Sequence, residues 1–424
     1  MIIRKLKQKL SNRFVRNFGW MGGAELVNRV FRLGTVVVLA RLLNSYDYGL
    51  AAIVLTVNEF VGVFTLKVGI SSKLIQAPER DIDELCETAY WMAWIIGVGL
   101  CLLQSIAAFP IAWIYDDNHL IWPIFVSALV YLGLPAFSVQ FALINRENRL
   151  GISALCNIIF TTISNILTII FALMGFGMWA IVLPILIASP TWIVVSRIKH
   201  PWRSSKPFTL YRWREIAGFA VDVLGVELLN KLRANLDYLL VGRFLGIEAL
   251  GVYFFAFNAG LGTSINILNA LTASLFPHLC DVRGNFVQLR KQYFGSFKTV
   301  ALVMIPLILL QTFLAPFYVP LIYGQKWLEA VPVLMLVCLS ALPRPFAEAA
   351  SMLLQAVDRT RINLYWNVLF TTIFAIGLVL AVQFGIIHVA ASVLIMHLIA
   401  LPLFTLWATR FVFGKKSFLR AEGI

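Results

Sequence analysis

Long apolar stretches, separated by short polar connections, follow one another along almost the whole chain. A helix needs about 20 mostly apolar residues to cross the hydrocarbon core of a bilayer, and twelve stretches reach that length. We expect these helices near 18–43, 47–70, 87–115, 120–144, 152–174, 177–197, 215–241, 247–279, 297–323, 328–356, 362–384 and 386–409. The connections are too short for an extramembrane domain. The pattern therefore predicts an all-α integral membrane protein with about twelve transmembrane helices.

The composition agrees with a membrane protein. Of the 424 residues, 60% are hydrophobic and only 13% are charged, and the mean hydropathy is +0.83. Soluble globular domains carry about 25% charged residues, so the composition excludes an ordinary soluble domain. The five cysteines show no paired spacing, which indicates neither a disulfide framework nor a zinc site.

The distribution of charge predicts the orientation of the helices, because Lys and Arg near transmembrane ends stay on the cytoplasmic side. If the N-terminus is cytoplasmic, the cytoplasmic segments hold most of the 35 basic residues, whereas one outer turn is the acidic pair Asp116-Asp117. We therefore expect both termini inside. The basic residues lack the aromatic interleaving of a nucleic-acid module, so no nucleic-acid partner is expected.

Two sequence segments of the first half recur in the second. Gly-Ala-Glu-Leu-Val-Asn-Arg at 23–29 returns as Gly-Val-Glu-Leu-Leu-Asn-Lys at 225–231, and a longer pattern from Arg149 to Ile163 returns from Arg359 to Ile373. An even number of helices in each copy makes the repeat parallel. We expect two parallel six-helix repeats, the N-lobe and the C-lobe, around a central cavity. The expected parts are a basic amphipathic cytoplasmic lead-in at 1–17 that is not a signal peptide, the N-lobe at 18–198, a basic cytoplasmic linker that acts as a hinge at 199–214, the C-lobe at 215–411 and a basic cytoplasmic tail at 412–424.

The first helix of each predicted repeat carries polar and charged residues on one face. Such residues are costly inside a bilayer and by default indicate function. The residues are Glu25, Asn28, Arg29 and Arg32 in the first helix, Glu227, Asn230 and Lys231 in the seventh, and Arg233 on an adjacent face of the seventh. In a structural interpretation, Glu25 pairs with Arg29 and Glu227 pairs with Lys231. A second structural interpretation places Lys67, Asp222 and Asp237 near helix ends, where their side chains reach the interface.

The functional interpretation places an anionic group among the cations. Arginine forks suit phosphate best, and the candidate anion-binding residues are Arg29, Arg32, Lys231 and Arg233. The candidates that position these cations, or bind a coupling proton or sodium ion, are Glu25, Glu227, Glu59, Asn28 and Asn230.

Three segments carry a family resemblance. Residues 235–253, residues 40–50 and residues 69–76 resemble the polysaccharide-transport (Wzx-type) flippases of the multidrug/oligosaccharidyl-lipid/polysaccharide (MOP) superfamily, and the resemblance covers essentially the whole chain. It implies a two-lobe bundle in a bacterial plasma membrane. Such a bundle moves an undecaprenyl-diphosphate-linked oligosaccharide, a repeat unit of O-antigen, capsule or exopolysaccharide, to the outer leaflet by alternating access. Glycosyltransferases and a polysaccharide polymerase are the partners that the resemblance implies.

Two other functions are alternatives to a flippase. A drug/cation antiporter of the same superfamily would require a cavity dominated by acidic residues. The stripe of cations formed by Arg29, Arg32, Lys231 and Arg233 disfavours this alternative. A membrane polysaccharide polymerase or ligase would present a large outer loop, whereas the predicted outer connections are turns. The five histidines have no metal spacing, and no Gly-rich phosphate loop is present. We therefore expect a transporter and not an enzyme, without catalytic residues, cofactor or metal.

Overall fold

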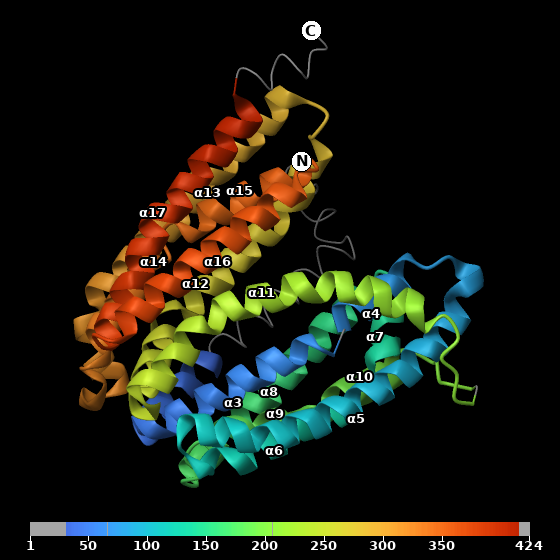
Figure 1. Cartoon of the computed structure of the whole chain (residues 1–424), viewed down its shortest axis with the longest axis horizontal. Coiled ribbons are helices and arrows are strands. Elements are labelled where there is room, and N and C mark those ends of the chain that lie inside the picture. The colour runs from blue at the N-terminus through green and yellow to red at the C-terminus, as the bar shows by residue number, and fades with distance from the viewer. Residues whose placement is uncertain (1–30, 66, 206, 415–424) are drawn as a thin grey trace, which may run out of the picture. The chain divides into compact units, whose positions relative to one another are not determined.

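The computed structural model describes residues 31–65, 67–205 and 207–414 (Figure 1), and every regular element in these ranges is a helix. Within the described residues, eight helical segments are long and apolar enough to cross a membrane. They are Glu79–Tyr115, Asn118–Ala136, Gly151–Leu173, Trp179–Lys199, Phe286–Tyr323, Ala330–Ala356, Thr360–Val382 and Ile386–Phe413. The chain is therefore an all-α, multi-pass membrane protein.

The chain divides into two compact units, Met1–Leu232 (unit 1) and Arg233–Ile424 (unit 2). The division falls inside helix α11 (Trp213–Leu245). The boundary predicted from the sequence lies earlier, at residues 199–214, and this assignment of lobes and linker stays a prediction.

Unit 1 begins, in its described part, with a helix over residues 31–42. The helices that follow are α3 (Ser45–Val63), α4 (Lys67–Gln76), α5 (Ile82–Tyr115), α6 (Ile121–Ala128), α7 (Ser138–Arg146), α8 (Leu150–Leu173), α9 (Trp179–Ala188), α10 (Pro190–Lys199) and the first part of α11. Short 3-10 turns lie at Glu79–Asp81, Asn118–Leu120 and Leu129–Ala136. The single helix expected at 120–144 is interrupted by the last of these turns, where Pro135 has no N–H to donate.

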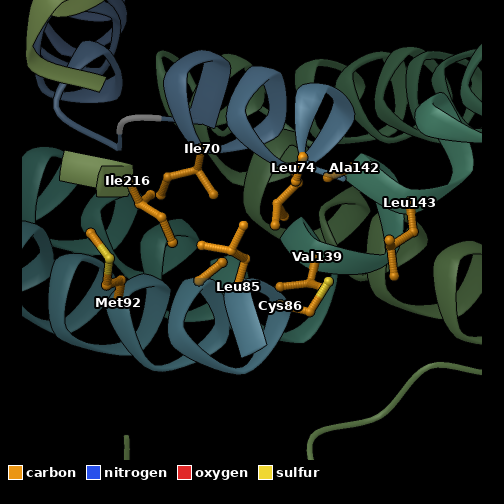
Figure 2. Close-up of a cluster of buried hydrophobic side chains, with 11 residues drawn as sticks. Ile70, Leu74, Leu85, Cys86, Met92, Val139, Ala142, Leu143 and Ile216 are labelled. Carbon is orange, nitrogen blue, oxygen red and sulfur yellow. The ribbon is translucent and has the colours of Figure 1, made fainter. Parts of the chain in front are cut away.

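A buried apolar cluster holds α4, α5, α7 and the start of α11 together, and Figure 2 shows its side chains converging from these helices. Leu74, Val139 and Ile216 are fully buried in it. Gly69 lets α4 approach α11 closely, because a Cβ added at Gly69 would lie 2.4 Å from the Cα of Ala220. The early part of α11 is thereby an integral part of unit 1.

The segment 199–214, predicted as a hinge, belongs to unit 1, and its described part packs on the helices of that unit. Trp202 and Leu210 pack on the buried cluster of Figure 2. The Glu87 carboxylate accepts hydrogen bonds from the Ser204 hydroxyl and the Ser205 N–H, at 2.5 and 2.9 Å. These contacts fasten the described part of the segment to the helices of unit 1.

Unit 2 contains the rest of α11, followed by α12 (Ile247–Asp281), α13 (Phe286–Tyr318), α14 (Ala330–Ser340), α15 (Arg344–Ala356), α16 (Thr360–Val382) and α17 (Ile386–Phe413). A π-helical turn extends α13 over Val319–Tyr323, and a 3-10 turn follows at Gln325–Trp327. The helix expected at 328–356 is two helices, which meet at Pro343. Phe255 stacks on the buried Trp327, with ring centroids 3.9 Å apart.

One recurring sequence pattern corresponds to two turns of the same geometry. Asn148 and Asp358 have positive φ angles of 54° and 58°, although neither is glycine. Each precedes the arginine at the N-cap of the next helix, Arg149 with φ −91° and ψ 46° and Arg359 with φ −106° and ψ 40°. The local likeness agrees with an internal duplication, while the complete arrangement of six plus six helices stays a prediction.

Candidate functional site

The predicted stripe of the first helix lies mostly outside the described residues. Glu25, Asn28 and Arg29 belong to that part of the chain, and Arg32 is the one member of the stripe that the structure describes. The side chain of Arg32 is exposed.

The stripe of the seventh helix lies on α11, and its cation finds a partner on another helix. The Lys231 Nζ lies 2.9 Å from Oε2 of Glu59 on α3, with the two side chains 42% and 47% exposed. Glu227, the partner expected from spacing, forms no ion pair within the described residues. It is partly buried, and Asn230 is exposed. The structure thus joins two predicted site residues, Lys231 and Glu59, and the expected pair of Glu227 with Lys231 is wrong.

Arg233 is partly buried, donates to an amide and lies within electrostatic range of the Glu348 carboxylate. Its Nη1 donates to Oδ1 of Asn367 on α16 at 2.5 Å. The amide of Asn367 is itself held, because its Nδ2 donates to the carbonyl of Asn363 at 2.9 Å. The side-chain oxygen of Asn363 accepts from the Ser351 hydroxyl of α15 at 2.5 Å. Arg233 is thus fixed by an ordered chain of polar groups that spans three helices.

Asp237, one turn further along α11, is only 5% exposed. Its carboxylate accepts from the Tyr253 hydroxyl of α12 at 2.8 Å and from the Tyr238 N–H at 3.0 Å. Arg344 of α15 lies within electrostatic range of Asp237 and Arg233. The interpretation that Asp237 reaches the interface from a helix end is therefore wrong, since burial and two hydrogen bonds keep it inside unit 2.

His397 of α17 lies within electrostatic range of Arg344 and Arg233. It is buried and stacks on Phe374, with ring centroids 5.6 Å apart and planes inclined by 3°. We call the group Arg233, Asp237, Tyr253, Arg344, Asn363, Asn367 and His397 the polar cluster of unit 2.

Sequence reasoning predicted Arg233 as a site residue but did not predict its partners. Asn367 carried a signal, because the recurring pattern matches it to Asn157 of the first half. Arg344 is a charged residue inside the apolar stretch 328–356. Asn363 and Ser351 carried no signal, because polar residues of these types occur in many membrane helices.

Ionic contacts of unit 1 gather at the ends of its helices. Arg146 donates to the carbonyls of Leu74 and Ile75, at 2.8 and 3.1 Å, and its Nη2 lies 3.1 Å from the Glu79 carboxylate. Arg212 pairs with Asp81 and Glu215. These contacts satisfy helix-end carbonyls and fasten connections, so they are structural.

A second group of ionic contacts lies around Glu147, between α7 and α8. The hydrogen bond from Arg149 lowers the pKa of the Glu147 carboxyl, and the ring of His200 adds to this effect at 3.2 Å. Across the residues that the structure describes, no group of three His, Cys, Asp or Glu side chains could hold a metal ion.

Comparison with known proteins assigns the chain to a family. Residues 38–332 match the family described as polysaccharide biosynthesis protein. The chain is 25% identical over 322 residues to the teichuronic acid biosynthesis protein TuaB of Bacillus subtilis (strain 168), a match that covers 76% of this chain and 66% of TuaB. It is 23% identical over 393 residues to the lipopolysaccharide biosynthesis protein WzxC of Escherichia coli (strain K12), covering 90% of this chain and 77% of WzxC.

The fold is also similar to a solved structure. The lipid II flippase MurJ in its inward closed conformation superposes with a TM-score of 0.76 and 15% sequence identity, over 95% of this chain and 89% of MurJ. At this identity the likeness shows the fold. Because the family match extends over more than half of the sequence, the chain belongs to the polysaccharide biosynthesis protein family.

Proposed function

We propose that the protein is a flippase that moves a lipid-diphosphate-linked oligosaccharide from the inner to the outer leaflet of a bacterial plasma membrane. Membership of the polysaccharide biosynthesis family supports this proposal, as does the fold shared with a lipid II flippase. The observation that carries it is Arg233, an arginine held by Asn367 in a unit whose α16 is apolar enough to span a membrane. A guanidinium is the side chain best suited to a diphosphate.

The finer architecture is part of the same proposal. It comprises twelve transmembrane helices in two parallel six-helix repeats, both termini in the cytoplasm, and alternating access of the two repeats. The recurring turn geometry at Asn148 and Asp358 supports a duplication. The lead-in, the two lobes, the linker and the tail keep the ranges predicted from the sequence.

Among the four predicted anion contacts, the proposal now ranks Arg233 first. Lys231 is engaged with Glu59, an acid that cancels its charge. Arg29 and Arg32 remain candidates from the sequence. Glu25 and Glu227 are proposed to bind a proton or a sodium ion if transport is coupled to an ion gradient, and glycosyltransferases and a polysaccharide polymerase are proposed partners.

Replacing Arg233 with alanine tests the proposal. Loss of a charge-assisted contact to the diphosphate should reduce export of the polysaccharide about 10- to 100-fold, and the lipid-linked precursor should accumulate on the cytoplasmic side. Export is measured as surface polysaccharide, and the amount of protein in the membrane is measured by immunoblotting. Arg214→Ala, at the exposed start of α11, is the matched control and should export normally. Normal export by Arg233→Ala would refute the assignment of Arg233 to the substrate.

A further inference from the structure

Helix α8 of unit 1 is a membrane span that carries a row of polar side chains. Only 11% of the residues in its apolar stretch are buried, against 28% or more in the other spans of the described residues. Most of its side chains are therefore accessible to some extent. We call the polar side chains that share one side of this helix the polar face of α8; they are Ser153, Asn157, Thr161, Ser164, Asn165 and Thr168.

The polar face lies opposite the apolar side of the same helix. At about 100° per residue, its members fall within an arc of about 120°. The exposed apolar side chains fall within a second arc, centred about 180° from the first. They are Leu155, Ile163, Ile166, Ile170 and Leu173. Apolar side chains suit the hydrocarbon of the bilayer, whereas an amide that faces it is costly. We therefore expect lipid to cover the apolar side and the polar face to point away from lipid.

Two side-chain amides on the polar face have no partner from the described helices. Asn157 is exposed, and Asn165, two turns further along, is partly buried. Neither side chain makes a hydrogen bond within the described residues. The Thr161 hydroxyl between them donates to the carbonyls of Asn157 and Ile158, at 2.8 and 3.1 Å. Both amides are thus available to a partner that is not one of these helices.

The matching helix of unit 2 uses the same sequence pattern in another way. Asn367 of α16, the counterpart of Asn157, is partly buried and accepts a hydrogen bond from Arg233. Asn363, one turn earlier, is buried and accepts from the Ser351 hydroxyl of α15. These asparagines connect helices within unit 2. Asn157 is exposed and connects none of the described helices, so fastening helices does not explain it.

The chemistry of the polar face suits an uncharged ligand with many hydroxyls. Helix α8 contains no Asp, Glu, Lys or Arg, so it cannot attract a diphosphate by charge. A side-chain amide both donates and accepts hydrogen bonds, as sugar hydroxyls do. We propose that the polar face of α8 binds the oligosaccharide of the lipid-linked substrate, with Asn157 and Asn165 as hydrogen-bond partners of sugar hydroxyls. This inference rests on the proposed function, and it gives the sugar and the diphosphate separate binding residues.

Two lipids that differ only in the sugar test the inference. The probes are undecaprenyl diphosphate and the lipid-linked repeat unit extracted from producing cells that lack this protein. The readout is the ratio of the affinities of the purified full-length protein for the repeat unit and for undecaprenyl diphosphate. Asn157→Leu and Asn165→Leu each remove one amide, and leucine is favourable in a helix. Asn157→Gln retains an amide, and Leu155→Ala on the apolar side is the matched control.

We expect each leucine variant to reduce the affinity ratio about three- to tenfold, the effect of losing one hydrogen bond. Asn157→Gln should reduce the ratio less than Asn157→Leu does, and Leu155→Ala should leave it unchanged. The unfolding temperature of each variant reports its fold, and if only one leucine variant folds, its ratio decides. An unchanged ratio in the folded leucine variants overturns the inference. An equal reduction in Leu155→Ala also overturns it, because the effect would then be general to the helix.

Arg233→Ala separates this inference from the proposed contact with the diphosphate. It should weaken the binding of both lipids alike and leave their ratio unchanged. If it weakens neither, the contact of Arg233 is refuted, while a reduced ratio in Asn157→Leu still supports the role of the polar face. If the unmodified protein binds neither lipid, the proposed function fails and the inference fails with it. If Asn157→Leu changes only the oligomeric state measured by light scattering, the polar face packs against a second copy of the chain and the inference is overturned.

Discussion

Lys231 and Arg233 lie two residues apart on α11 and have different kinds of partner. Lys231 pairs with the Glu59 carboxylate, and both side chains are more than 40% exposed. Arg233 is partly buried and contacts the neutral amide of Asn367. Two residues along a helix are about 200° apart, so the two cations face different neighbours. The comparison teaches that neighbouring cations on one helix can have partners of different kinds, a carboxylate for Lys231 and an amide for Arg233.

The same contrast holds more widely between the two units. In unit 1, acids and bases pair directly at helix ends, as Arg212 does with Asp81 and Glu215. In unit 2, Arg233 and Asp237 are held by an amide and a tyrosine hydroxyl inside the helical bundle. Pairs at helix ends contribute little individually because water and salt screen them. Charges in the interior are costly to leave unsatisfied, so their partners have larger effects.

The largest effect is therefore expected from Asp237→Ala. This change removes the acceptor of the Tyr253 hydroxyl. It also removes the Asp237 carboxylate that interacts electrostatically with Arg344. Removing one partner of a buried charged group costs about 3–5 kcal/mol, so the unfolding temperature of the purified protein should fall steeply. Tyr253→Phe, which removes one hydrogen bond, should cost about 1 kcal/mol. Equal effects of the two substitutions would show that Asp237 does not balance Arg344.

Most of the fold could be predicted from the sequence, because the length of an apolar stretch is a direct consequence of bilayer thickness. The predicted ranges agree with α5, α8, α16 and α17 to within a few residues, apart from extensions at the ends. The interruption at Pro135 could not be predicted with the same rule. Pro110 and Pro402 lie inside uninterrupted helices, so a proline in an apolar stretch does not by itself predict an interruption.

The candidate site was less accessible to sequence reasoning, because side-chain partners depend on tertiary packing. Helical spacing suggested Glu227 for Lys231, whereas the partner is Glu59, far away in the sequence. One interpretation of the sequence placed Asp237 near a helix end. In the structure Asp237 is buried in unit 2 and accepts a hydrogen bond from Tyr253. Charge and repetition predicted candidate residues, whereas the packing of the helices determines what each described candidate contacts.

A smaller effect is expected when the exposed pair is broken. Glu59→Gln removes the ion pair of Lys231, and exposed ion pairs contribute about 0–1 kcal/mol. The unfolding temperature should change little, and export should stay within about twofold of the unmodified protein because Arg233 and Asn367 are untouched. Glu59→Gln and Arg233→Ala are best measured side by side in one export assay. A loss with Glu59→Gln as large as that with Arg233→Ala would remove the distinction between the two cations.

The smallest effect is expected at a turn of unit 1 outside the spans, where Asp117 is held by several donors. Its Oδ2 accepts from the Tyr46 hydroxyl at 2.5 Å, and its Oδ1 accepts from the His119 N–H at 2.8 Å. Burial by itself would raise the pKa of Asp117, but the hydrogen bonds from Tyr46 and His119 outweigh it and lower the pKa below the ordinary value of 3.8. The ionised carboxylate therefore stabilises the folded chain.

The pH dependence follows from the direction of this shift. The stabilisation by Asp117 is complete well above pH 3.8, and it is lost as the pH falls below 3.8 through the lowered pKa of the folded protein. At pH 6 we expect the free energy of unfolding of the unmodified protein to exceed that of Asp117→Asn by less than about 1 kcal/mol. Its unfolding temperature should be slightly higher accordingly. This difference should vanish under acid. The comparison is made in a His119→Gln background, which removes the neighbouring titratable ring. A difference that persists below the lowered pKa would mean that the shape of the side chain, and not its charge, stabilises this turn.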